Sequence, residues 1–238
     1  MLDIEDLVND YTEKTKELFK KWKKGDLHQG KLFIEDGVVN PKVYYACEDR
    51  ILFLLKEAYS DDEEFCLTEY LADKGKGIPA MWRRVSEWTK LIVEALAGKN
   101  GTTLFKRNGE FEHLGNEYLQ RIAVVNIKKS NGKSNSKNDD LQKYIDKDAK
   151  ELLTQLKICD PTIIVCGNVE PYLRQILKLD KKDLEFNEPV EREHFVYHFE
   201  LNGHDVKVLS YWHPSNYYPN LMNYYGFEGI CRVAFGKK

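Results

Sequence analysis

The stretch Val206-Lys-Val-Leu-Ser-Tyr-Trp-His-Pro-Ser-Asn-Tyr-Tyr-Pro-Asn220 decides how this chain folds. It begins with a short apolar run typical of a buried strand, and the run gives way to His213-Pro214-Ser215 where a loop must begin. Ligands of an open α/β sheet bind beyond the carboxyl ends of its strands. The pattern therefore predicts that His213 lies at a ligand site, although a single His-Pro-Ser tripeptide is common and carries little weight alone.

Three earlier apolar runs have the same character, and helix-length connections separate all four. They are Ile51–Leu55, Ile122–Val125 and Thr162–Cys166. This alternation predicts an α/β fold, a three-layer sandwich whose four-stranded, mostly parallel central sheet has helices on both faces. Asn202-Gly203, just before the last strand, predicts a tight hairpin.

Polar residues follow three of the four predicted strands. Glu57 comes after the first strand, Asn126 after the second and His213 after the fourth. If the strands are parallel, a carboxylate, an amide and an imidazole project from one edge of the sheet and meet around a common cavity. Each residue taken singly also fits an ordinary solvated strand exit.

The first part of the chain, residues 1–45, is expected to be an extension to an α/β domain formed by residues 46–238. Apolar residues recur along Leu2–Trp22 at helical spacing, and we interpret the lysines at the end of this helix as a solvated face. Asp36-Gly37 lies between apolar runs and predicts a hairpin turn. A charged stretch from Lys178 to Glu193 is interpreted as an exposed connection.

The composition restricts the classes of protein to consider. With 238 residues, 42% of them hydrophobic, the chain has enough apolar side chains for a sizeable core. A net charge of -3 argues against a globally basic nucleic-acid-binding protein, so any polyanion site must be local. The five cysteines form no Cys-x-x-Cys pair, which favours reduced thiols over a disulfide framework or a metal site. We expect a cytoplasmic monomer without a membrane segment or a cofactor.

The order of these motifs resembles the uracil-DNA glycosylase superfamily, from about Ile51 to about Asn220. Leu54-Leu-Lys-Glu-Ala-Tyr-Ser60 stands in the place of the first motif, which reads Gly-Glu-Ala-Pro-Gly in the branch that has an iron–sulfur cluster. Val125-Asn-Ile-Lys-Lys129 is similar to the strand end Asn-Val-Val-Lys-Cys of that branch. Trp212-His-Pro-Ser-Asn-Tyr-Tyr218 is similar to its Phe-His-Pro-Ser-Tyr-Leu-Leu.

The chain departs from that branch at several positions. Lys56 replaces the first glycine of the first motif and Tyr59 replaces its proline, which adds bulk and charge where the backbone should approach the deoxyribose. Ser130 stands where a cluster cysteine would be, so no iron–sulfur cluster is expected. Phe65 and Tyr70 are the candidates for the aromatic residue that stacks on the base.

The resemblance implies a DNA repair hydrolase that flips a base out of DNA and cleaves its N-glycosidic bond. The Lys-containing loop 131–138 is a local basic segment that suits a DNA backbone. The implied roles are catalysis for Glu57 and His213, base binding for Asn126 and Ala58, phosphate contacts for Lys128 and Ser215, and a wedge in the base stack for Tyr217 or Tyr218.

Two other interpretations stay open. The first is a non-catalytic nucleotide- or DNA-binding module with the same fold, which would agree with the altered first motif. The second is an unrelated α/β enzyme that acts on a small nucleotide or sugar, in which case the order of the motifs is a coincidence.

Overall fold

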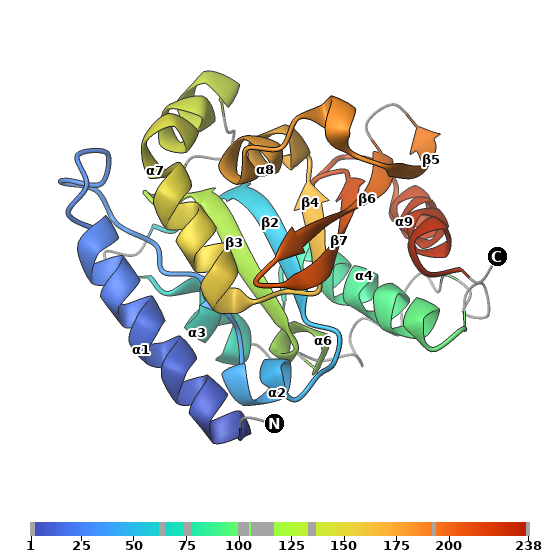
Figure 1. The fold of residues 1–238 in the computed structure, drawn as a ribbon, viewed down its shortest axis with the longest axis horizontal. Helices are drawn as coiled ribbons and strands as arrows, with labels where there is room; N and C mark the ends of the chain where they lie inside the picture. Colours follow the sequence, from blue (N-terminus) through green and yellow to red (C-terminus); the bar gives the residue numbers. More distant parts are fainter. Residues whose placement is uncertain are drawn as a thin grey trace.

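A mixed sheet of seven strands forms the centre of the molecule. The computed structural model describes residues 3–61, 65–73, 78–99, 105, 117–132, 137–191 and 194–236. The strands lie in the order β1-β3-β2-β4-β7-β6-β5 (Figure 1). Their bounds are Gly37–Val38 for β1, Ile51–Glu57 for β2, Ile122–Lys128 for β3, Ile163–Gly167 for β4, Phe186–Glu191 for β5, His194–Leu201 for β6 and His204–Tyr211 for β7.

The four predicted strands are the four at the centre of this sheet, and the α/β class is confirmed. β3, β2, β4 and β7 are neighbours and pair in parallel, with Leu54 of β2 between Val125 of β3 and Cys166 of β4. They end at the upper edge of the sheet in Figure 1. The prediction of a four-stranded sheet is wrong, because β1 adds to one side and β6 and β5 add to the other, all three in antiparallel pairing.

The hairpin predicted at Asn202-Gly203 is confirmed. Both residues have positive φ, 52° and 80°, the combination that a type I′ turn between β6 and β7 requires. The interpretation of residues 178–193 as an exposed connection is wrong in part, because β5 lies within this stretch and pairs with β6. The β5 sequence, Phe186-Asn-Glu-Pro-Val-Glu191, lacks the apolar pattern of a buried strand, and a proline is tolerated in it because β5 is an edge strand.

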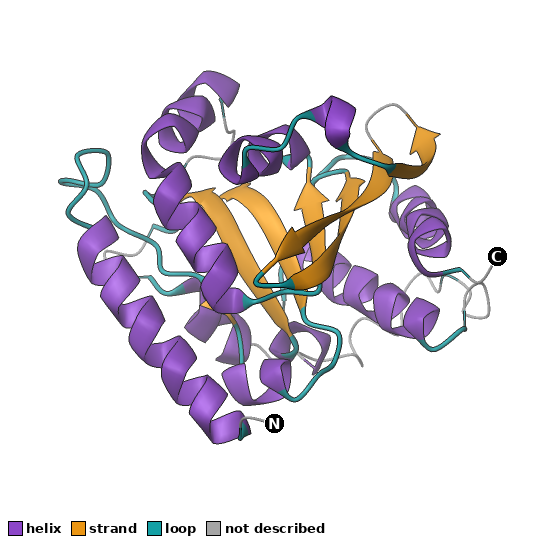
Figure 2. Cartoon of the chain, viewed as in Figure 1, coloured by secondary structure: helices purple, strands orange, loops and turns teal. Residues whose placement is uncertain are grey.

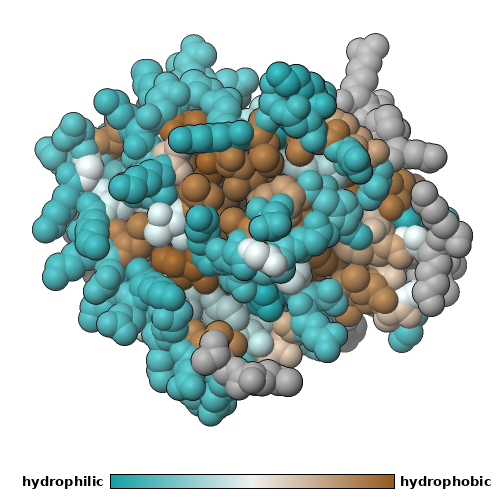
Figure 3. All heavy atoms as spheres, viewed as in Figure 1, coloured by the Kyte–Doolittle hydropathy of each residue, from teal (hydrophilic) through white to brown (hydrophobic). Residues whose placement is uncertain are grey.

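Helices cover both faces of the sheet (Figures 1 and 2), and each face has its own apolar core. The face drawn in Figure 3 is largely hydrophilic, with apolar patches between the polar side chains. No helix within the described ranges is both long and apolar enough to cross a bilayer. Residues of α1 (Ile4–Trp22), α2 (Pro41–Tyr45), α7 (Asn138–Cys159) and α8 (Glu170–Leu177) belong to one core, and residues of α3 (Leu67–Asp73), α4 (Ala80–Leu96), α6 (Glu117–Gln120) and α9 (Asn220–Phe235) belong to the other.

The hairpin predicted at Asp36-Gly37 is wrong. The chain does not fold back on itself there; instead β1 pairs antiparallel with β3, with Gly37 opposite Val124, and Phe33 forms a bridge with Ser130. Residues 33–38 therefore follow the outer edge of β3. The turn signal fails because Asp36 is buried, and its carboxylate accepts hydrogen bonds from neighbouring elements rather than from a local turn.

Gly37 is a position where a larger residue should be costly. Its φ is 142°, and a Cβ added there would lie 2.5 Å from the buried Tyr11 hydroxyl, which accepts a hydrogen bond from the Val38 N–H. We expect Gly37→Ala to lower the free energy of unfolding by about 2–3 kcal/mol, measured by urea denaturation. Gly203→Ala is the matched control, because its φ is also positive but no atom lies within 4 Å of the added Cβ. Equal losses from the two variants would contradict a role for the Tyr11 contact.

Candidate active site

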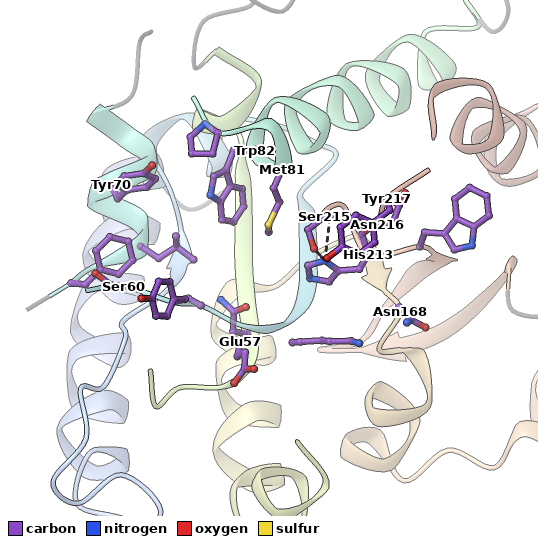
Figure 4. A pocket seen from close by; sticks show the side chains of 18 of the residues that line it. Glu57, Ser60, Tyr70, Met81, Trp82, Asn168, His213, Ser215, Asn216 and Tyr217 are labelled. Atoms are coloured by element: carbon purple, nitrogen blue, oxygen red, sulfur yellow. Dashed lines mark hydrogen bonds between the residues drawn. The ribbon is translucent and has the colours of Figure 1, made fainter. Parts of the chain in front are cut away.

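A cavity of about 870 Å³ opens where the central parallel strands end. Glu57 from β2, Asn126 from β3 and His213 from the loop after β7 all line it (Figure 4 labels Glu57 and His213). Three residues that are far apart in the sequence therefore come together, as predicted. β2 and β3 extend beyond their predicted ends at Leu55 and Val125, so Glu57 and Asn126 lie within these strands and not after them. The cavity lining also includes other residues predicted for the site, which are Ala58, Ser215, Tyr217 and Tyr218, and it includes Lys56, Phe65 and Tyr70.

Glu57 is held tightly at the end of β2. One carboxylate oxygen, Oε2, lies 2.8 Å from Lys128 Nζ, and only 5% of the Glu57 side chain is exposed. Lys128 Nζ also lies 2.6 Å from Asp140 Oδ2 of α7. Although burial opposes it, the hydrogen bonds that Lys128 donates to Asp140 and Glu57 raise its pKa above the ordinary value. Lys128 is absent from the cavity lining, so the structure places its ammonium group on these two carboxylates and not at the mouth of the cavity.

Asn126 is fixed by a buried carboxylate that the sequence analysis missed. Its backbone N–H and its Nδ2 both donate to Asp36 Oδ2, at 2.8 and 3.1 Å. The other oxygen, Oδ1, accepts from Lys129 Nζ at 2.5 Å and from Gln155 Nε2 at 2.9 Å. The side chains of Asp36 and Lys129 are both 0% exposed, and this burial lowers the pKa of Lys129 despite the opposing effect of Asp36. The sequence signal that could have found Asp36 is a carboxylate with apolar residues close by on both sides.

The hydrogen bonds of His213 define its tautomer. Its Nδ1 accepts from the Ser215 backbone N–H at 3.2 Å and lies 2.7 Å from Ser215 Oγ. A backbone amide can only donate, so Nδ1 carries a lone pair and the ring proton is on Nε2. Burial, and then the charge of Lys56, lower the pKa of His213 to about 4, so the imidazole is neutral at pH 7.

This neutral imidazole should make folding stability depend on pH. An ordinary histidine titrates near pH 6.5, whereas folded His213 has a pKa of about 4. Between these values the unfolded chain binds a proton that the folded chain does not, so stability rises with pH. The contribution of neutral His213 is thus complete above about pH 6.5 and is lost as pH falls toward 4. The stability difference between wild type and His213→Ala, measured by urea denaturation, should shrink over this range, and a constant difference would contradict the lowered pKa.

The loop that carries His213 is held from two helices. Arg84 of α4 donates through Nη1 to the carbonyl oxygens of Pro214 and Asn216, at 2.6 and 3.0 Å. Asn216 exchanges side-chain hydrogen bonds with Asn223 of α9, at 2.7 and 3.0 Å. Neither Arg84 nor Asn223 has a local sequence signal, because the partners of both lie in another element. His213 is therefore fixed before any ligand arrives.

The two tyrosines after this loop have different surroundings. Tyr218 packs on Trp212, with ring centroids 4.2 Å apart, whereas Tyr217 is 100% exposed. Both line the cavity. Since the Tyr217 ring is wholly exposed and Tyr218 packs on Trp212, Tyr217 is the freer of the two side chains to contact a ligand.

Aromatic side chains also line the far side of the cavity. Phe65 and Tyr70, the predicted stacking candidates, have ring centroids 5.5 Å apart. Trp82 of α4 belongs to the apolar core and also lines the cavity beside Met81 (Figure 4). The cavity thus has apolar flat surfaces together with polar groups.

The predicted basic loop lies only partly within the described residues. Residues 133–136 fall outside them. Asn131 is described, and its side chain joins the exits of β3 and β2, accepting from the Ser60 N–H at 3.0 Å and donating to the Ser60 carbonyl at 2.7 Å. Gly132 donates its N–H to the Ala58 carbonyl at 2.9 Å.

The residues around Ser130 do not fit an iron–sulfur cluster. Ser130 Oγ lies 2.8 Å from His28 Nδ1, and His28 Nε2 lies 3.0 Å from Asp148 Oδ2, all three residues being buried. The five cysteines are free. Among the described residues, no group of three or more His, Cys, Asp or Glu side chains is arranged to hold a metal ion.

No protein-family model matches this chain, and no curated protein matches its sequence. The chemistry of the cavity is therefore inferred from the residues that line it.

Proposed function

We propose that the cavity binds a nucleobase flipped out of DNA and that the protein hydrolyses its N-glycosidic bond. The observation that carries this proposal is the meeting of Glu57, Asn126 and His213 around one cavity with aromatic walls. Enzymes that act on a flipped base read its edge by hydrogen bonds and stack its face on aromatic or apolar side chains. A cavity of about 870 Å³ is within the range of small-ligand sites.

Asn126 and His213 act on different parts of such a base. The Asn126 amide pairs with the edge of the base, while Phe65, Tyr70 or Trp82 covers its face. When the bond between C1′ and the base nitrogen breaks, its electron pair stays on the base and negative charge develops on a carbonyl oxygen. The neutral His213 donates its Nε2 proton in a hydrogen bond to that oxygen, which stabilises the transition state.

Glu57 acts on the water that completes the reaction. The water oxygen bonds to C1′ as the base leaves, and one water proton passes to the Glu57 carboxylate and finally to the base, so that atoms and charge balance. Lys128 holds this carboxylate in place at 2.8 Å. Tyr217, wholly exposed at the cavity, fills the space that the flipped nucleotide leaves in the stack.

A second candidate function is a base-binding module without turnover. The contacts of the segment Leu54–Ser60 favour this function. The Glu57 side chain is nearly inaccessible and pairs with Lys128, and the Tyr59 hydroxyl donates a hydrogen bond to Asp61. A buried carboxylate that is already paired with a lysine positions a ligand more readily than it activates water.

A uracil-containing oligonucleotide separates the two functions. After incubation with the protein, hot alkali breaks the strand only where hydrolysis has left an abasic site, and a denaturing gel shows the break. Breaks that are lost in Asn126→Ala support the glycosylase, and binding without breaks supports the module. Neither binding nor breaks, even at low salt where phosphate contacts are strongest, would contradict both. His198→Ala, outside the cavity lining, serves as the control variant.

Gly132 should matter to this chemistry because its backbone lies against Glu57. A Cβ added at Gly132 would lie 2.6 Å from Glu57 Cδ and 2.7 Å from Oε2. We expect Gly132→Ala to displace the carboxylate and to slow hydrolysis about tenfold. Gly229→Ala, where no atom lies within 4 Å of the added Cβ, should keep the full rate. Equal rates for both variants would remove Glu57 from the mechanism.

A further inference from the structure

We infer that Asp36 fixes the orientation of the Asn126 amide and thereby makes the cavity select a base edge in which an N–H lies next to a carbonyl. This inference rests on the proposed function, because it concerns which base the same cavity takes. Asp36 does not contact the base; it is a positioning residue that acts through Asn126.

The contacts of Asp36 leave its carboxylate only one role. It accepts four hydrogen bonds, from the Asn126 N–H, Asn126 Nδ2, Lys129 Nζ and Gln155 Nε2. All four partners are N–H donors, so both carboxylate oxygens act as acceptors. An asparagine amide can otherwise rotate by about 180°, which exchanges its oxygen and its NH₂ group. Here the NH₂ group must face Asp36, because two oxygens facing each other would repel.

Burial makes this orientation difficult to reverse. The side chains of Asp36 and Lys129 are 0% exposed, so water does not compete for the contact. The same oxygen that holds Asn126 Nδ2 also holds the Asn126 backbone N–H, which fixes the carboxylate relative to β3. Turning the amide would place two buried acceptors together without a donor, which is costly in a low-dielectric interior.

The fixed amide offers Oδ1 as an acceptor and its second N–H as a donor. Uracil matches this order with its N3–H and the adjacent carbonyl, and hypoxanthine matches it with N1–H and O6. A base could turn over to match either order, so the selection requires a second contact that fixes its pose, and the proposed hydrogen bond from His213 to the base supplies it. In that pose cytosine and adenine present the reverse order, a ring nitrogen that accepts next to an amino group that donates. The geometry therefore favours bases with a lactam edge, and it disfavours bases with an amidine edge.

Titration of the wild-type protein with free bases tests this selection directly. Binding of uracil, cytosine and 3-methyluracil is followed by NMR chemical-shift changes. We expect uracil to bind at least about tenfold more tightly than cytosine, and 3-methyluracil to lose the advantage because it lacks the N3–H. If none of the three binds, the proposed base cavity fails and this inference fails with it. If uracil binds no better than cytosine, the inference fails alone.

The variant Asp36→Asn tests whether Asp36 causes the selection. Because Lys129 and Gln155 both donate to the same oxygen of residue 36, the new amide should turn its oxygen to them and its NH₂ group to Asn126. The Asn126 amide should then invert, and the preference for uracil over cytosine should fall about tenfold or reverse. A folded Asp36→Asn protein that keeps the wild-type preference would overturn the inference.

Gln155→Met is the matched control. It removes two hydrogen bonds to Asp36, to Oδ1 and to the carbonyl oxygen, but it leaves the contact between Asp36 and Asn126. It should lower stability and keep the preference for uracil.

The wild-type protein supplies a second measurement in case Asp36→Asn does not fold, since that variant leaves the Asn126 backbone N–H without its acceptor. An Nδ2 proton that is bonded to a buried carboxylate should exchange with solvent slowly. We expect an NMR signal for that Asn126 proton that persists in D₂O, and exchange as fast as in an exposed asparagine would overturn the inference.

Discussion

His213→Ala is expected to slow hydrolysis of the uracil-containing oligonucleotide by about 10²–10³-fold, since this is the usual cost of removing one donor that stabilises a developing oxyanion. The donor is preorganised, because Ser215 fixes the imidazole through Nδ1 and Arg84 fixes the loop that carries it. The rate is measured under single-turnover conditions, so that chemistry and not product release is observed. His198→Ala should keep the wild-type rate, and equal losses from both variants would contradict the assignment.

The sequence predicts the centre of the sheet and not its edges, for a physical reason. Strands covered on both faces must be apolar throughout, and Ile51–Leu55 and Ile122–Val125 show that pattern plainly. Edge strands need not be apolar: β5 has a mixed sequence that includes a proline, and β1 has only two residues. The pairing of β1 and β5 depends on which strand lies beside each of them, and the local sequence gives no information about that neighbour.

The residues of the candidate site also fall into two groups, those that the sequence predicts and those that it does not. The positions of Glu57, Asn126 and His213 follow from parallel strands that end at one edge, so a strand prediction is enough to bring them together. Asp36 and Arg84 were missed because their partners come from distant elements. Asp36-Gly37 even has the composition of a turn, and only the pairing of β1 with β3 shows that the carboxylate points inward.

Lys129→Met is expected to lower the free energy of unfolding by about 3–5 kcal/mol, because it leaves the Asp36 carboxylate buried without its counter-ion. Urea denaturation measures the loss. Lys14→Met is the control: Lys14 pairs with Asp10 on the exposed face of α1, where such a pair contributes about 0.5 kcal/mol or less.

The double variant Asp36→Asn/Lys129→Met shows whether the loss comes from an unpaired charge. With both charges gone, no ion of this pair is left in the core. The double variant should therefore lose less free energy of unfolding than the sum of the losses in Asp36→Asn and Lys129→Met. Strictly additive losses would mean that Lys129 stabilises the protein through packing against Trp22, whose ring centroid lies 5.2 Å from its Nζ, and not through Asp36. In that case Asp36 would tolerate the loss of its cation, and the buried carboxylate would hold Asn126 through hydrogen bonds alone.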